Sequence, residues 1–408
     1  MKASVQRVTK IYTFVGILFG INLSFAQIVK QHPLLEPTSN TFSVLSAQDS
    51  RFFARQNYVV YGFLPYWSVE HLDDIQVDKL TDIAYFALSV NKDGSITKIT
   101  SDGTSDPGYE AWRNNKELDA FISKGKDAGV RFSITVISHI SDDTDYLLMC
   151  ESCWDTLAKD LIAELRFRNL SSVNLDFEYA TYTEPHLADQ YTKLATFIKQ
   201  RLDAEFGSSY VVVSTFADAV IKPRVTKVDD LAKVVDALFI MAYDFRTRSS
   251  ESSGPSAPID GAGSSSIYDI RTMLRDYLAT IPPTKLILGV PYYGNNYLVE
   301  SASPMSRRIE GNDAIGYSET QTYADITNLL RQVSVNVLWD DIALTPYFNY
   351  NSLESGLLRQ VYFENAKSLS HKYDLAVNNN LAGVGIWALG YDGKETELWE
   401  LLHHKFIL

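Results

Sequence analysis

Residues 171–180, SSVNLDFEYA, alternate apolar strand-forming side chains with polar ones. The apolar positions are Val173, Leu175 and Phe177. The positions between them carry an amide and two acids, Asn174, Asp176 and Glu178. Because successive side chains of a strand point to opposite faces, the pattern predicts that these three polar groups share one face.

Two acids on one face of a strand can work together in acid catalysis. Their side chains start about 6.6 Å apart, twice the strand rise, so Asp176 can reach either Asn174 or Glu178 by changing rotamer. A proton shared between the two acids would raise the apparent pKa of the pair, because adjacent negative charges repel. A carboxyl group that keeps its proton near neutral pH is suited to be a general acid. The alternative is a buried ion-pair network in which Arg166 or Arg168 neutralises the acids.

Eight strand-like segments, separated by stretches with helical spacing, must position these acids. The segments are 58–65, 82–90, 131–138, 172–179, 210–217, 237–245, 285–293 and 383–390. Strands that alternate with helices favour parallel pairing, and an α/β fold of the (β/α)8 TIM barrel type closes eight of them most simply. An open doubly wound sheet is the alternative. The long interval between the last two segments predicts a small α+β insertion at about 295–360.

A barrel would give the polar face of residues 172–179 a definite place. Asn174, Asp176 and Glu178 would point into the barrel and toward its C-terminal rim. An unpaired carboxylate deep in a core costs several kcal/mol, whereas the C-terminal rim is where barrel enzymes place their chemistry. The pattern therefore favours an active site over a structural role.

The same stretch resembles the fourth-strand signature of glycoside hydrolase family 18, the chitinases, which reads D-x-x-D-x-D-x-E. Further segments resemble motifs of that family in its order: YGFLPYWS (61–68), FIMAYDF (239–245), GPSAPI (254–259), KLILGVPYYG (285–294) and LAGVGIWALGYDG (381–393). The C-terminal part is similar to a bacterial branch that includes spore-cortex and germination-type hydrolases. The resemblance covers nearly all of residues 57–393.

The resemblance implies hydrolysis of β-1,4-linked N-acetylglucosamine polymers by substrate-assisted retaining catalysis, in which the substrate's own acetamido group is the nucleophile. Glu178 matches the general acid/base, and Asp176 matches the residue that steadies the acetamido N–H. Tyr243 matches the hydroxyl donor to the acetamido carbonyl. The predicted substrate-binding residues are Asn174, Asp244, Trp387, Tyr292 and Phe63, with Trp387 as the aromatic floor.

Some positions depart from the family pattern. Ser171 and Asn174 stand where the family has aspartates, and Phe63 stands where it often has a tyrosine. Since Asn174 cannot take a proton from Asp176, the pH profile is expected to differ. The Ser/Gly-rich stretch 246–266 is either a mobile rim over the cleft or an inert linker. Two other functions stay open: a peptidoglycan N-acetylglucosaminidase, and a chitinase-like lectin that binds sugar without cutting it.

The N-terminus has the anatomy of a cleavable secretory signal. A basic start is followed by an apolar run and by small residues at Ser24 and Ala26. We therefore expect residues 1–26 to be a signal peptide, 27–56 an N-terminal arm and 57–408 the catalytic domain of a secreted protein with no membrane span after cleavage. The apolar run is shorter than the roughly 20 residues that a membrane anchor needs.

Charge and ligand chemistry restrict the partners. The formal charge of −13 becomes −16 without residues 1–26, because three cations and no acids leave with them. Such a chain repels nucleic acid, so a neutral polysaccharide is the expected partner. The two cysteines, Cys150 and Cys153, are a local disulfide or an incidental pair, and the seven histidines show no ligand spacing. No metal or cofactor is predicted, and the oligomeric state stays open.

Overall fold

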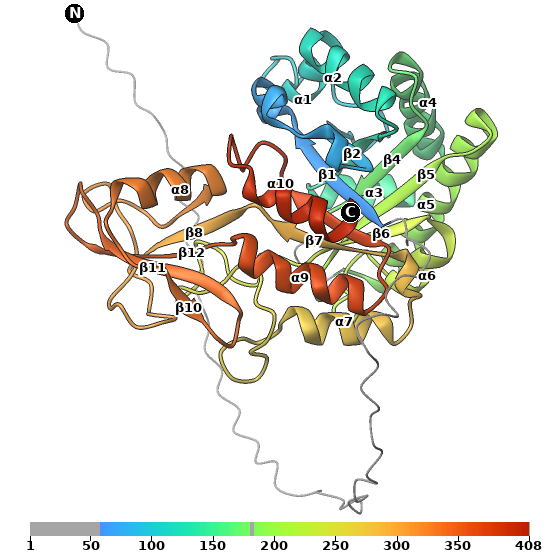
Figure 1. Ribbon diagram of the computed structural model, residues 1–408. Coiled ribbons are helices and arrows are strands. Elements are labelled where there is room, and N and C mark those ends of the chain that lie inside the picture. The colour runs from blue at the N-terminus through green and yellow to red at the C-terminus, as the bar shows by residue number, and fades with distance from the viewer. Residues whose placement is uncertain (1–57, 180–182, 408) are drawn as a thin grey trace, which may run out of the picture. The chain divides into compact units, whose positions relative to one another are not determined.

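The computed structural model describes residues 58–179 and 183–407 (Figure 1). Eight parallel strands close into a barrel in the order β1–β13–β7–β6–β5–β4–β3–β2. They are β1 (Val59–Pro65), β2 (Asp82–Ser89), β3 (Arg131–Ile137), β4 (Ser172–Asp176), β5 (Tyr210–Phe216), β6 (Ala237–Met241), β7 (Leu286–Pro291) and β13 (Gly383–Trp387). The predicted (β/α)8 barrel is thereby confirmed. The predicted signal peptide and N-terminal arm lie outside the described residues.

Helices cover the outside of the barrel (Figure 1). They are α1 (Pro107–Asn114), α2 (Lys116–Asp127), α3 (Ser141–Met149), α4 (Glu151–Phe167), α5 (Pro185–Phe206), α6 (Val228–Val234), α7 (Ile270–Leu278), α9 (Ala366–Asn378) and α10 (Glu397–Leu402). Short turns of 3-10 type lie at Tyr66–Asp74, Val77–Lys79 and Pro283–Lys285, and the chain closes with a wider turn, His403–Ile407. No helix in the described part of the chain is long and apolar enough to cross a membrane.

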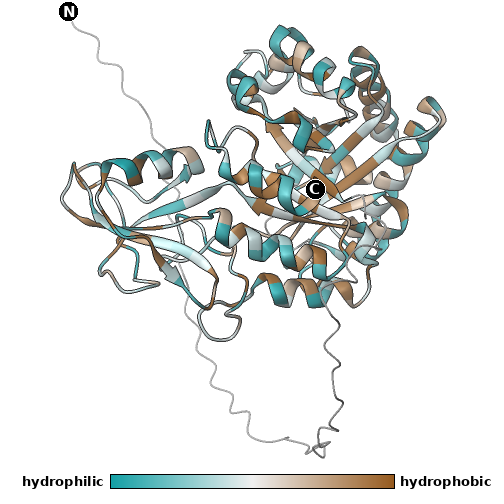
Figure 2. Ribbon diagram, viewed as in Figure 1, coloured by the Kyte–Doolittle hydropathy of each residue, from teal (hydrophilic) through white to brown (hydrophobic). Residues whose placement is uncertain are grey.

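The helix α5 shows how the local sequence sets these boundaries. Proline 185 starts the helix, where a missing N–H costs nothing, and Gly207 ends it with a left-handed φ of 76°. The buried side chains between them recur at helical spacing: Leu187, Tyr191, Leu194, Ile198 and Leu202. This stripe packs on the barrel, whose strands are largely apolar in Figure 2.

A smaller lobe is inserted between β7 and β13, as the fold prediction expects. Its antiparallel sheet has the order β10–β11–β12–β8–β9. The strands are β8 (Tyr293–Leu298), β9 (Glu319–Thr322), β10 (Leu338–Asp340), β11 (Thr345–Asn351) and β12 (Leu358–Tyr362), and α8 (Tyr323–Gln332) packs beside them. The lobe begins one residue after β7 ends, so barrel and lobe share a nearly continuous strand.

The lobe holds the Ser/Gly-rich segment 246–256 in place. Asn295 donates to the backbone oxygen of Arg246 at 3.1 Å, and the Tyr297 hydroxyl donates to that of Gly254 at 3.2 Å. Arg308 donates to the backbone oxygen of Ser250 at 2.9 Å. This part of the predicted rim is therefore clamped by hydrogen bonds from a second structural layer, and it is not an inert linker.

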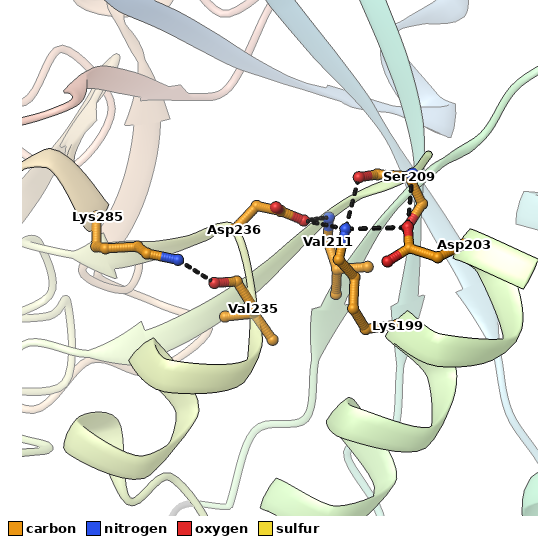
Figure 3. A network of polar contacts seen from close by, with 7 residues as sticks. All are labelled: Lys199, Asp203, Ser209, Val211, Val235, Asp236 and Lys285. Carbon is orange, nitrogen blue, oxygen red and sulfur yellow. Dashed lines mark hydrogen bonds and ion pairs between the residues drawn. The ribbon is translucent and has the colours of Figure 1, made fainter. Parts of the chain in front are cut away.

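A polar network ties α5, β5, β6 and β7 together where these strands begin (Figure 3). The Lys199 ammonium lies 3.0 Å from Asp236, 3.1 Å from Asp203 and 2.8 Å from the Ser209 backbone oxygen. Two further contacts extend it: Val211 N–H to Asp236 at 2.7 Å, and Lys285 to the Val235 carbonyl at 2.6 Å. Since it lies at the N-terminal end of the barrel, this network serves stability, and the opposite rim is left for chemistry.

A disulfide joins Cys150 to Cys153. It connects the end of α3 to the first turn of α4, with Cα atoms 5.2 Å apart. Of the two interpretations of this pair, the structure therefore adopts the local disulfide, and the described residues include no free cysteine.

Asp392, just after β13, should make stability depend on pH. Its side chain is 1% exposed, and burial raises its pKa to about 7. The folded state therefore holds a proton that the unfolded chain has released, so stability is lost as the pH rises from about 4 to 7. We expect Asp392→Asn to raise the free energy of unfolding at pH 8 by a few kcal/mol relative to wild type, and much less at pH 4. Urea unfolding at both pH values measures this, and an equal difference at both would contradict it.

Candidate active site

The two acids of β4 meet at the C-terminal mouth of the barrel. Asp176 is the last residue of β4 and is 3% exposed, while the Glu178 side chain, two residues on, is 37% exposed. Oxygens of the two carboxyl groups lie within 4.8 Å of each other. The alternate side chains, Val173, Leu175 and Phe177, are buried in the core cluster that the barrel helices share. The alternation read from the sequence thus describes the strand correctly.

The ion-pair alternative for these acids is wrong. Arg166 pairs with Glu205, and Arg168 pairs with Asp119 and donates to the Trp112 backbone oxygen. Both arginines lie at the end of α4 or just after it, at the N-terminal side of β4. Neither can neutralise a carboxylate at the opposite end of the strand.

A cleft of about 680 Å³ opens over the acids. Six of the eight predicted site residues line it: Asp176, Glu178, Tyr243, Asp244, Trp387 and Phe63. They come from β4, β1 and β13 and from the segment after β6, so their convergence depends on barrel closure. A cleft of this size can hold a short stretch of a polymeric ligand.

Burial keeps a proton on the pair of acids. The pKa of Asp176 is raised well above its ordinary value, first by burial and then by the charge of Glu178. Burial also raises the pKa of Glu178; the neighbouring His139 opposes this increase and Asp244 adds to it. Both shifts favour the protonated form of the pair, and a carboxyl group that holds its proton more tightly is better suited to be a general acid.

Tyr243 and Asp244 turn toward the acids because the chain bends sharply after β6. Asp244 has a left-handed φ of 59°, a conformation that concentrates at functional sites in non-glycine residues. Its carboxylate accepts hydrogen bonds from Tyr293 and from Ser256. The pKa of the Tyr243 hydroxyl is raised well above its ordinary value by burial and by Asp176, so this hydroxyl remains a donor.

Aromatic rings form the floor of the cleft. Trp387 ends β13, and its ring lies 4.7 Å from that of Phe86 and 5.5 Å from that of Phe63. Phe63 is only 1% exposed and packs 4.8 Å from Phe239 inside the barrel. Phe63 therefore supports Trp387 from below, and the indole offers the larger surface to a ligand.

Two of the predicted substrate-binding residues are misplaced. Tyr292 is fully buried, and its hydroxyl lies 3.3 Å from that of Tyr373 on α9, so it faces the helices. Its neighbour Tyr293 takes the inward position, because a shift of one residue reverses the face of an extended chain.

Asn174 is also fully buried, one layer below Asp176, where it exchanges hydrogen bonds of 3.2 Å with Ser214 on β5. Neither Tyr292 nor Asn174 can touch a ligand in the cleft.

His139 is a site residue that the sequence analysis missed. Its Nε2 atom lies 3.7 Å from the nearer Glu178 oxygen. The strand register accounts for this: Ile137 at the end of β3 pairs with Asp176 at the end of β4, and His139 and Glu178 each follow two residues later. Spacing between histidines carries no such signal, but the register of two neighbouring strands does. His139, Asp176 and Glu178 lie close enough to hold a cation, but a cation needs ionised carboxylates and burial favours the protonated form of both acids, so we assign none.

Comparisons with known proteins agree with this geometry. The family model described as "Glycosyl hydrolases family 18" matches residues 59–392. Probable di-N-acetylchitobiase 1 of Dictyostelium discoideum is 29% identical over 56% of this chain, which spans 62% of that relative's length. The cortical fragment-lytic enzyme of Bacillus anthracis is 22% identical over 81% of this chain and 69% of its own.

Among solved structures, the Group IV chitinase of Ostrinia furnacalis in complex with allosamidin shares the fold. The TM-score is 0.72 at 21% identity, and the match covers 85% of this chain and 98% of that one.

Proposed function

This chain belongs to glycosyl hydrolases family 18, and from that premise we propose that it hydrolyses the β-1,4 linkages of chitin or chito-oligosaccharides by substrate-assisted retaining catalysis. The observation that carries the proposal is the pair of neighbouring carboxyl groups at the barrel mouth. Asp176 and Glu178 lie within 4.8 Å on one strand edge, on one side of any sugar in the cleft. Ordinary retaining glycosidases hold their acid and nucleophile about 5–5.5 Å apart across the scissile bond, a rule to which family 18 is an exception. A nucleophile supplied by the substrate suits the arrangement.

In the proposed mechanism, the Glu178 carboxyl group donates its proton to the leaving glycosidic oxygen. The carbonyl oxygen of the 2-acetamido group attacks the anomeric carbon, and an oxazolinium ion forms. Asp176 steadies the acetamido N–H, and the Tyr243 hydroxyl donates to the acetamido oxygen. The Glu178 carboxylate then takes a proton from water, which opens the oxazolinium ring and restores the acid.

The remaining roles follow from position in the cleft. Trp387 offers an aromatic face to the apolar side of the cleaved sugar, and Asp244 provides a polar contact beside Tyr243. We include export in the proposal, since residues 1–26 read as a secretory signal. A secreted enzyme would meet a polymeric substrate that is too large to enter a cell.

A second candidate, a peptidoglycan N-acetylglucosaminidase, is favoured by one feature of the cleft. Lys222, Arg224 and Arg246 line the same cleft as Glu178, in a chain of net charge −13. The first two share a single acid, Asp218, at 3.4 and 2.7 Å. Arg246 donates to serine oxygens and, within the described residues, has no carboxylate within 4 Å. The cleft lining contains more carboxyl groups than cations, but Arg246 has no carboxylate partner in the described part of the chain, and a cation of this kind suits a glycan that carries carboxylates, such as lactyl groups or stem peptides.

Side-by-side assays separate these candidates. Wild-type protein is expected to release chromophore from chitotriose glycosides, and a thiazoline analogue of the oxazolinium ion is expected to inhibit competitively. Activity that the thiazoline leaves unchanged would contradict substrate assistance. Sugar binding with no release from any substrate would identify a lectin instead.

The cationic side chains provide a second test. If the natural substrate carries carboxylates, Lys222→Gln combined with Arg246→Gln is expected to lower kcat/KM on purified peptidoglycan about tenfold or more, since a charge-assisted hydrogen bond contributes roughly 1.5–3 kcal/mol. Hydrolysis of neutral chitotriose should change little. An equal loss on both substrates would show that the two cations do not select for charge.

A further inference from the structure

His139 stands beside the proposed general acid with no role yet assigned. Its Nε2 atom lies 3.7 Å from the Glu178 carboxylate, and the two side chains are 39% and 37% exposed. Within residues 58–179 and 183–407, no lysine or arginine nitrogen comes within 4 Å of Glu178, so His139 is its only neighbour that can carry positive charge at that distance. The pair stands at the mouth of the barrel, where a leaving group would sit.

The backbone on both sides of this pair is tied to α3. Ser138 and Thr144 are both buried, and their hydroxyl groups lie 2.7 Å apart, while Thr144 also donates to the Ile140 backbone oxygen at 3.0 Å. The Tyr179 hydroxyl donates to Asp145 of the same helix at 2.9 Å. The residues that flank His139 and Glu178 are therefore anchored to one helix, which holds the two backbone positions from which these side chains extend.

Among the groups around Glu178, His139 is the one that lowers the pKa of its carboxyl group. The titratable groups that face Glu178 from the other elements are Asp176 at the end of β4 and Tyr243 and Asp244 after β6. Next to His139 along the chain, the first turn of α3 carries Asp142 and Asp143. Burial raises the pKa of Glu178 most, and His139 acts in the opposite direction.

We propose that His139 is a positioning residue that holds the carboxyl group of Glu178 toward the cleft and couples activity to the charge of the imidazole. A protonated imidazole attracts the carboxylate and favours its ionised form. A neutral imidazole leaves the proton on Glu178. The inference rests on the proposed role of Glu178 as the general acid.

Two substitutions that change charge in opposite directions test this proposal. His139→Gln removes the positive charge, so the alkaline limb of the kcat/KM profile, which reports loss of the acid's proton, is expected to move to higher pH. His139→Lys makes the charge permanent, and the same limb is expected to move to lower pH. Both variants should lose about tenfold in kcat with KM nearly unchanged, less than the roughly 10²-fold that a 1 Å misplacement can cost.

His404→Gln is the matched control. This exposed histidine lies in the C-terminal turn, whose Phe406 packs 5.5 Å from Tyr58 at the opposite end of the barrel. Its variant should behave as wild type. The inference is overturned if both His139 variants keep wild-type kcat and pH profile, or if both shift the profile in one direction. Loss of the folded state in both, measured by thermal unfolding, would also overturn it, because a half-exposed positioning residue is not required for folding. If the wild-type protein is inactive, the proposed function itself is wrong.

Discussion

Replacing Glu178 by glutamine is expected to lower kcat on chito-oligosaccharides by several orders of magnitude, at least the 10²–10⁴-fold that positioned acid–base catalysis contributes. Glutamine has the shape of the protonated acid but has no proton to give to the leaving oxygen. Because Glu178 lines the cleft without forming its floor, oligosaccharide binding should persist. Steady-state kinetics with a chromogenic chitotriose glycoside, together with calorimetric binding of the unmodified oligosaccharide, measures both quantities.

Glu184→Gln provides the comparison. Glu184 is exposed at the start of α5, six residues along the chain, and does not line the cleft. Its variant should keep wild-type kcat. If Glu178→Gln retained more than about a tenth of wild-type activity, Glu178 would not be the general acid. If wild type and variant were equally inactive while both bound sugar, the protein would be a lectin.

The second large effect concerns stability and lies away from the cleft. Lys372 of α9 and Glu364, just after β12, form an ion pair of 2.8 Å whose side chains are 0% and 3% exposed. Burial raises the pKa of Glu364 and lowers that of Lys372, and each partner opposes the other's shift. We expect Lys372→Met to reduce the free energy of unfolding by about 3–5 kcal/mol, because it leaves a carboxylate buried without a partner. The loss should shrink at low pH, where Glu364 can take up a proton.

An exposed pair with the same separation is the control. Lys233 lies 2.8 Å from Asp230, but its side chain is 68% exposed, and Lys233→Met should change the free energy of unfolding far less than Lys372→Met does. The double variant Lys372→Met with Glu364→Leu should recover much of the loss, because an apolar pair has no charge to desolvate. Denaturant unfolding of the three variants tests this. Similar losses for Lys372→Met and Lys233→Met would contradict the argument.

The barrel could be predicted from sequence because each strand has a local signal. The alternation of Val173, Leu175 and Phe177 with polar residues identifies β4 and its inward face, and the helical spacing in α5 identifies its packed stripe. Local signals do not define where the strands end. The chain was predicted to stay extended to residue 245, but β6 stops at Met241 and the chain bends at Asp244. At that bend the Asp244 backbone N–H donates to the Ser256 hydroxyl and the Asp244 carboxylate accepts from Tyr293, and only the folded chain brings these partners near.

The candidate site shows the same division between local and nonlocal information. Residues carried by a strand motif, Asp176 and Glu178, lie where the motif predicts. The sequence analysis predicts Tyr292 as a binding residue, but nothing local shows which of two adjacent tyrosines turns inward after β7 ends. His139 has no motif at all. It reaches Glu178 only through the register between β3 and β4, which is a property of the closed barrel.

The hydrogen bonds between the inserted lobe and segment 246–256 limit how this enzyme can be redesigned. Asn295, Tyr297 and Arg308 support the backbone beside Arg246, which in turn lines the cleft. Deleting or exchanging the lobe alone would deprive that stretch of its scaffold and alter ligand preference without touching a residue that meets the ligand. A successful graft must carry both pieces together, as a single transplantable cassette.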